Sequence, residues 1–503
     1  MTRFLSLSLA AVLVAACTTV VTGGTGGGGN GTDDGGAKVD PVSTAKLAEG
    51  LALTDIALFQ ATKVPVVSEG ERVADASSAL VAGRPGVLRA YVTPGEGWEE
   101  KPVVAYLTLV TAAGKTTKEI KKTVSAASSD DKVGSAFDFV LKAEEVTADL
   151  KFAVTLALDG ETTLDAPPAE SETRYPRNGE QEALGASKLA DVLKIVLVPV
   201  QYAADGSNRL PDVSEEQVEI YRKTMLSLYP VAKVDIQVRE PYKWSSAIGG
   251  NGAGWSEVLN ALIRLRAADQ VDDDVYYYGA FSPKNSLQQF CNQGCVTGLS
   301  GLAEDASDAR IRASVGVGFS GESSASTAAH EIGHAHGRDH APCGGAQGPD
   351  SKYPYPQAKI GVWGYNILTS EFVNPAAAET PHDMMSYCEP TWISDYQYRK
   401  LFDRVTAVNA MRGTQSQRTG AKQKFRLATI DGQGAVTLGE QLELPVGTTG
   451  VQRAVTFRTA KGGTITDSAR FFRYDHLPGG VLFIPEHKEA TLVDVQGAHL
   501  THL

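Results

Sequence analysis

The stretch HEIGHAHGRDH, residues 330 to 340, decides what fold and chemistry the chain is expected to have. His330 and His334 are four residues apart, so on an α-helix both side chains project from the same face, one turn from each other. Glu331 is next to the first histidine and can face a water molecule on a shared metal ion. The spacing therefore predicts a helix that presents two imidazoles to one metal.

A glycine and a third histidine complete this pattern. Gly337 can adopt a positive φ, which ends the helix and brings His340 to a third coordination position. Three neutral nitrogens that leave one position open to water are typical of a catalytic zinc site, because structural sites fill all four positions with protein. Zinc lowers the pKa of that water toward about 7. Glu331 is then expected to accept its proton during attack on a carbonyl and to pass it to the leaving amine.

The whole pattern is far rarer by chance than its first half. HExxH alone is expected by accident about once in a hundred chains of this size, and the extended pattern on the order of once in 10⁵. Three unrelated surface histidines are therefore a poor explanation. His336 lies on another face of the helix from His334, so we expect it to pack or to lie at the surface.

HExxHxxGxxH resembles the signature of the metzincin zinc peptidases, which also have a methionine turn beneath the metal. Residues 382 to 388, HDMMSYC, are similar to that turn, with Met385 as the supporting methionine. The resemblance implies that Tyr387 is a further metal ligand at rest and a donor to the oxyanion; the alternative is a tyrosine that only packs there. It also implies a substrate-binding edge strand at residues 298 to 303. Ala341 departs from the Ser, Asp, Glu or Pro of the better-known families.

The N-terminus predicts export. A short apolar run from residue 4 to 14 follows Arg3 and precedes Ala-Ala-Cys17, which resembles the bacterial lipobox. Residues 1 to 16 are therefore expected to be a lipoprotein signal peptide, and Cys17 to be lipidated; the alternative is an ordinary secretory signal. Residues 17 to 45 are glycine-rich and are expected to form a tether. The protein should be exported and held at the membrane by its lipid alone, at the outer membrane or cell surface of a Gram-negative host.

Four further cysteines follow, and an even number in an exported chain suggests two disulfides, with three pairings open. Cys291 and Cys295 lie in CNQGC, whose Asn and Gly favour the tight turn of a local bridge. The second bridge would then join Cys343 to Cys388 and tie the loop of the third ligand to the methionine turn. A zinc site made of these thiols is the alternative. Because Cys17 is the only cysteine before residue 291, the sequence contains no cysteine-switch segment, and any latency is expected to use another device.

The hydrophobic pattern divides the chain into three folded parts. Residues 46 to 180 contain short alternating segments with Gly and Pro between them, which predicts an immunoglobulin-like β-sandwich. Residues 190 to 413 alternate strands and helices, which predicts a mixed, mostly parallel sheet with the active-site helix. Residues 420 to 503 return to β segments. The expected fold class is multidomain: an α/β metzincin catalytic domain flanked by the N-terminal β-sandwich and a small C-terminal β domain.

The net charge and the complete histidine motif limit the classes of function that the chain can have. The net charge of −12 argues against nucleic acid as a partner. We expect a zinc-dependent endopeptidase that cleaves extracellular proteins or glycoproteins. The alternative is a surface adhesion or glycoprotein-binding lipoprotein with an inert metal domain, which is disfavoured because Glu331 and every ligand are present. Hydrolysis of a non-peptide amide also fits the motif. A Ca²⁺ site at residues 272 to 274 or 304 to 308 is possible only on the ground of their negative charge, because their spacing gives no support. His382 is expected at the surface or near the substrate. The sequence leaves the oligomeric state open.

Overall fold

The computed structural model of the 503-residue chain describes residues 19–22, 40–292, 294–412, 422–445, 449–495 and 501–502. The expected signal peptide and Cys17 lie outside the described residues, and so does most of the expected tether. No helix within these described ranges is long and apolar enough to cross a membrane.

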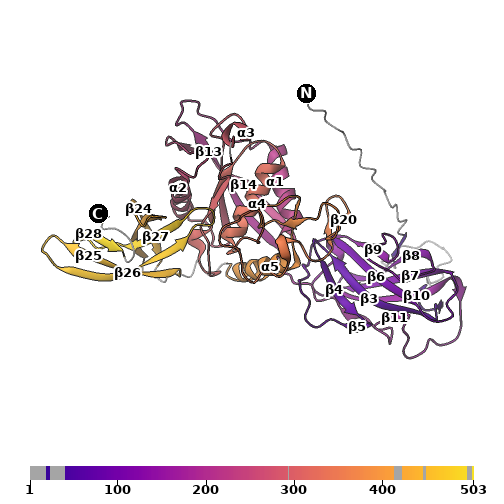
Figure 1. Cartoon of the computed structure of the whole chain (residues 1–503). Coiled ribbons are helices and arrows are strands. Elements are labelled where there is room, and N and C mark those ends of the chain that lie inside the picture. Colours follow the sequence, from indigo (N-terminus) through magenta and orange to yellow (C-terminus); the bar gives the residue numbers. More distant parts are fainter. Residues whose placement is uncertain are drawn as a thin grey trace, which may run out of the picture. The chain divides into compact units, whose positions relative to one another are not determined.

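The protein is multidomain and rich in β structure, with several sheets and few helices (Figure 1). Its contacts divide it into two compact units. Unit 1 takes the described residues of 1–59, 64–76 and 85–186, and unit 2 takes those of 60–63, 77–84 and 187–503.

Unit 1 contains two antiparallel sheets. In β9, Phe137, Phe139 and Leu141 are buried and alternate with the less buried Asp138 and Val140, as a strand with one face on the core requires. The sheet with the order β5-β4-β3-β6-β9 consists of Glu71–Arg72, Lys63–Ser68, Leu51–Phe59, Gly86–Pro94 and Phe137–Leu141. The other has the order β1-β8-β7-β10-β11, with β2 and β12 also on β10: Thr19–Thr22, Gly114–Val124, Lys101–Thr111, Lys151–Thr162, Arg174–Tyr175, Ala45–Leu47 and Glu182–Ala183.

The main sheet of unit 2 positions the site. It has the order β14-β13-β16-β18-β17, with β15 also paired to β13. All its pairs are parallel except the last, in which β17 runs antiparallel to β18 at the edge. Its strands are β13 (Val192–Tyr202), β14 (Lys233–Val238), β15 (Tyr242–Trp244), β16 (Val275–Phe281), β17 (Gly298–Ser300) and β18 (Ala313–Val317).

The helices of unit 2 have clear sequence causes. Ser214 and Ser394 cap two of them, because each hydroxyl accepts a hydrogen bond from the amide three residues on. The helix that carries the histidine motif is rich in alanine on the side that packs against β18 and α1. The helices are α1 (Glu215–Leu228), α2 (Trp255–Ala268), α3 (Leu287–Phe290), α4 (Glu322–Ala335) and α5 (Asp395–Ala410).

The C-terminal strands form a separate antiparallel sheet that belongs to unit 2 (yellow in Figure 1). Phe425 and Phe483 from this sheet share a core with Leu299 and Ile311 beside the main sheet. The order β24-β23-β27-β26-β25-β28-β29 consists of Val436–Pro445, Lys422–Asp431, Gly479–Pro485, Thr464–Arg473, Val451–Thr459, Ala490–Val495 and Thr501–His502. Two small sheets complete the unit: β19 (Gly364–Asn366) with β20 (Glu371–Val373), and β21 (His382–Asp383) with β22 (Thr391–Trp392).

Two short segments from within the N-terminal part of the chain also belong to unit 2. The buried guanidinium of Arg84 donates to the carbonyls of Gln60 (2.8 Å), Val231 (2.9 Å) and Ser227 (3.2 Å). The indole of Trp392 donates to the carbonyl of Ala61 at 2.9 Å. Residues 60–63 and 77–84 are therefore structural parts of the unit that holds the histidines.

Candidate active site

Three histidine rings are held with the same nitrogen turned away from their common centre. The Nδ1 atoms of His330, His334 and His340 lie 2.7, 2.6 and 2.7 Å from the carbonyl oxygens of Met384, Arg338 and Gln347. A carbonyl only accepts, so each Nδ1 must carry the proton and each Nε2 must present its lone pair. This is the arrangement by which proteins orient histidine ligands of a metal.

The three lone pairs face one another at short range. His334 Nε2 lies 3.0 Å from His330 Nε2 and 3.1 Å from His340 Nε2. Because no proton is left to share between these atoms, the arrangement is repulsive by itself and favourable around a cation. Burial lowers the pKa of His330 and His334, and lowers that of His340 to about 4, so all three rings are neutral at ordinary pH. The donor set therefore fits a zinc ion.

Glu331 lies beside this cluster and is buried. Its Oε2 has no hydrogen-bond partner, and its Oε1 lies 2.9 Å from Nε2 of His476. Burial, and next the charge of Asp475, raise the pKa of Glu331. Gly298 on β17 leaves the space for this carboxylate, since a Cβ there would lie 2.1 Å from Glu331 Oε1. An uncompensated buried oxygen at this place is a second sign that the site is built for a positive group.

The expected methionine turn lies under the helix. Met385 is fully buried, and a Cβ at Gly333 would lie 2.5 Å from its Sδ. The carboxylate of Asp383 accepts from the amides of Met385 and Ser394, each at 2.9 Å, which fixes the turn to the start of α5. Burial raises the pKa of Asp383 to about 6.

Gly337 ends the helix with φ +75°, the left-handed conformation that the sequence predicts for it. A Cβ at this residue would lie 2.3 Å from the carbonyl oxygen of Ala303. The amide of Arg338 then donates to the carbonyl of Gly333 at 3.0 Å. This turn carries the chain from the helix to His340.

Both expected cysteine pairs lie at disulfide distance. The Cα atoms of Cys291 and Cys295 are 5.1 Å apart, and those of Cys343 and Cys388 are 5.8 Å apart. The second pair joins the loop after the third histidine to the methionine turn.

Tyr387 lies at the open side of the histidine cluster, with its ring centroid 5.0 Å from that of His340. Its hydroxyl is hydrogen-bonded to Nδ1 of His476, and 43% of the residue is exposed. Burial raises the pKa of this phenol.

The remaining candidates lie elsewhere. His336 is buried and stacked on Tyr276, with centroids 4.1 Å apart, so it is a packing residue. His382 is half-buried, and its Nδ1 lies 2.8 Å from the carbonyl of Gln357. In the part of the chain that the structure describes, neither acidic stretch considered for Ca²⁺ forms a cluster with metal-ligand spacing, and Asp274 is paired with Lys194 and Arg412.

Asp475 and His476, in the loop between β26 and β27, were missed by the sequence reasoning. The ligand atoms of His330, His334, His340 and His476 all lie within 4.8 Å of one another. No motif links His476 to the others, because it lies 136 residues after His340 and its place depends on how the C-terminal sheet packs. The fourth position that the sequence leaves to water is thus approached by an imidazole.

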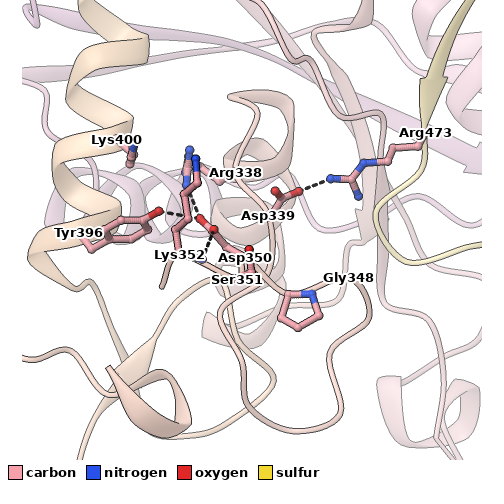
Figure 2. Close-up of a pocket in the computed structure, with 10 residues that line it drawn as sticks. Arg338, Asp339, Gly348, Asp350, Ser351, Lys352, Tyr396, Lys400 and Arg473 are labelled. Carbon is pink, nitrogen blue, oxygen red and sulfur yellow. Dashed lines mark hydrogen bonds and ion pairs between the residues drawn. The ribbon is translucent and has the colours of Figure 1, made fainter. Parts of the chain in front are cut away.

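A polar cavity of about 500 Å³ is lined by Arg338 and Asp339, the two residues before the third histidine (Figure 2). Arg338 and Tyr396 both contact the carboxylate of Asp350, at 3.3 and 2.8 Å. Arg473, from the end of β26, also lines the cavity and forms an ion pair with Asp339.

Comparisons with known proteins give one informative match. No curated protein matches the chain. The chain is similar to solved structures titled "Structure of a chaperone-substrate complex" (12% identity, TM-score 0.24, 55% of this chain and 39% of that one) and "Crystal structure of putative beta-galactosidase from Bacteroides fragilis" (10%, 0.13, 48% and 35%). It spans less than half the length of either, and TM-scores this low carry no argument. Residues 311–430, which include the histidine motif and the methionine turn, match the family model described as Peptidase M66, and this supports a metal-dependent peptidase.

Proposed function

We propose that the protein is a zinc-dependent endopeptidase of the metzincin type that hydrolyses peptide bonds of extracellular proteins or glycoproteins. The observation that carries the proposal is the trio of neutral Nε2 atoms, in which that of His334 lies 3.0 and 3.1 Å from the other two, with the buried carboxylate of Glu331 beside it. His330, His334 and His340 would hold one zinc ion.

The chain's own residues have distinct roles in the reaction. Bound zinc supplies a Lewis acid and lowers the pKa of a coordinated water toward about 7. Glu331 accepts the proton of the attacking water and delivers it to the departing amine. Tyr387, whose hydroxyl already lies at the open side of the cluster, donates to the oxyanion that forms on the carbonyl.

The edge strand β17 is the proposed place for the substrate backbone. It pairs with β18 on one side only, so its opposite edge is where the backbone of an extended peptide would add as a further strand. Such pairing recognises a polypeptide by its backbone, which favours proteins over small amides as substrates.

Export and a lipid on Cys17 belong to the same proposal. They rest on the signal-like residues 1 to 16 and on the glycine-rich residues after them. A lipid anchor and a flexible tether would leave the peptidase at the cell surface, where extracellular proteins reach it.

The alternative function is a surface adhesion or glycoprotein-binding lipoprotein. No specific observation favours it, because the general base and all three histidines are present and buried.

The test uses the full chain, a peptide library and measured zinc content. Glu331→Gln keeps the size of the side chain but cannot accept the proton, so we expect cleavage to stop while one zinc per chain remains. Glu322→Gln, an exposed change at the start of the same helix, is the matched control and should cleave as the parent does. Each protein is also tested with His476→Ala, which removes the imidazole beside Glu331. Cleavage that survives Glu331→Gln, or zinc-loaded protein that cuts nothing in either background, would contradict the proposal.

A further inference from the structure

We infer that the C-terminal domain closes the active site of its own chain. Residues 473–476, which we name the closing segment, occupy the free edge of β17, and His476 provides a fourth ligand to the metal. This inference rests on the proposed function, because it assigns an occupant to the peptide edge and to the water position of that same site.

The closing segment pairs with the edge strand in the way an extended peptide would. Tyr474 forms an antiparallel bridge with Gly301. The amide of Leu302 donates to the carbonyl of Arg473 at 3.0 Å, and the amide of Asp475 donates to the carbonyl of Ser300 at 3.3 Å. The carbonyl of Ser300 and the amide of Leu302 are therefore already hydrogen-bonded to the closing segment.

His476 lies where the reacting water would have to be. Its Nε2 is 2.9 Å from Glu331 Oε1, the distance at which a general base contacts the water it deprotonates, so the proton on this nitrogen passes to Glu331 when the nitrogen binds the metal. Its ring centroid lies 4.8 Å from that of His340 and 5.2 Å from that of His330. The hydroxyl of Tyr387 is hydrogen-bonded to Nδ1 of His476, so both ring nitrogens of this imidazole have a partner that holds its orientation. Zinc held by four protein ligands has no position left for water.

Asp475 makes the segment complementary to a cation. Its Oδ1 accepts from the amide of Ser300 at 3.0 Å, which orients the carboxylate. Its Oδ2 is buried without a hydrogen-bond partner, 3.5 Å from His334 Nε2 and 3.3 Å from His476 Nε2. A buried negative oxygen is costly unless a positive charge is close, and an ion among the histidines provides it.

The fold holds the closing segment in place from both ends. Arg473 forms an ion pair with Asp339, the neighbour of His340, as Figure 2 shows. Tyr474 is buried in the core shared by the C-terminal sheet and the main sheet, and Leu477 packs against that core. Activation therefore requires this loop to leave the site. Since the chain has no cysteine switch, the closing segment takes that role.

The first measurement counts ligands and does not depend on activity. X-ray absorption at the zinc edge of the full chain should show four imidazole nitrogens, and His476→Ala should show three and a water oxygen. His476→Ala should also lose zinc to a chelator faster. His487→Ala is the matched control, because this histidine of the same domain pairs with Asp467 and is outside the cluster. It should match the parent in both measurements.

The second measurement is cleavage of a peptide library by the same proteins. His476→Ala should cleave at least roughly ten-fold faster than the parent, because activity falls with the fraction of molecules whose site is open. Arg473→Ala, which removes only the ion pair, should give a smaller gain.

The outcomes separate the two ideas. Three imidazoles and a water in the parent, or a loss of cleavage in His476→Ala, would overturn the closing role and make His476 a catalytic residue. A chain that binds no zinc would overturn the proposed function as well. Four imidazoles in the parent, with no cleavage even after His476→Ala, would keep the fourth ligand but reject the peptidase.

Discussion

At the scale of single residues, the site depends on two glycines, because a side chain at either position would overlap a neighbour. Gly298 and Gly333 each lie where a Cβ would overlap a functional neighbour, Glu331 in one case and Met385 in the other. The histidine motif leaves the residue at 333 free, so its pattern alone does not require a glycine there. The requirement comes from the sulfur that packs against the helix.

Gly333→Ala tests the contact between the helix and the methionine turn. In an ordinary helix interior this change stabilises by about 1 kcal/mol, because alanine has the higher helix propensity. Here we expect the opposite sign, a loss of roughly 1–3 kcal/mol in the free energy of unfolding, since Met385 Sδ must move. Urea denaturation followed by circular dichroism measures it. Stabilisation would show that the sulfur moves aside without cost.

Asp383→Asn tests the buried carboxylate of the methionine turn by its pH dependence. The folded pKa of about 6 lies above 3.8, the ordinary value for an aspartate, so the folded state binds the proton more tightly than the unfolded state does. The contribution of Asp383 to stability is therefore complete below about pH 4 and is lost as pH rises through about 6. The free energy of unfolding of the parent minus that of the variant should fall by up to about 3 kcal/mol across this window. A difference independent of pH would contradict the raised pKa.

At the scale of elements, the edge strand β17 connects the sheet to the chemistry. It is three residues long, and all three are buried. Its backbone faces β18 on one side and the closing segment on the other, while Gly298 admits the carboxylate of Glu331 from α4. A strand this short positions the general base and the proposed peptide edge together.

Gly298→Ala should separate metal binding from catalysis. The new Cβ would meet the carboxylate of Glu331 at 2.1 Å, so the side chain has to turn away from the reacting water. We expect cleavage in the His476→Ala background to fall by about 10²-fold or more, the size of effect typical for a general base. Zinc content should stay at one per chain, because the three histidines are untouched. Parallel loss of zinc would instead indicate that the helix itself has moved.

At the scale of the whole molecule, unit 2 is assembled from distant parts of the chain. Residues 60–63 and 77–84 belong to it, and so does the C-terminal sheet. The domain ranges expected from the sequence, 46–180, 190–413 and 420–503, are continuous, whereas unit 2 contains two short segments from within the first range. A protein cut at residue 187 would lack Arg84 and the carbonyl groups that surround it.

Arg84→Ala tests whether the inserted segments stabilise unit 2. The change leaves the carbonyls of Gln60, Ser227 and Val231 without their buried donor and creates a cavity, which should cost about 3 kcal/mol or more. Tryptophan fluorescence measures this well, since four of the five tryptophans, all except Trp98, are in unit 2. Arg177→Ala, in an exposed position of unit 1, is the control and should leave this transition unchanged.

The local geometry of the site could be predicted from short stretches of the sequence. Two histidines one helical turn apart, a glycine that must take positive φ and a methionine turn all depend on contacts within short stretches, and short-range spacing encodes them. The capped helices and the alternating strands were predictable for the same reason. The local CNQGC turn likewise pointed to the first cysteine pair, and the second followed from it.

The residues that fill the rest of the site depend on packing between distant segments and could not be predicted from spacing. Asp475 and His476 reach the histidine cluster because the C-terminal sheet shares a core with the main sheet, and no local pattern records a packing between such distant segments. The same is true of Arg84, whose partners lie more than a hundred residues further along the chain except for Gln60. The spacing of residues along the sequence determines which side chains one helix places on the same face. Which distant segment packs against that face depends on the burial of many side chains together.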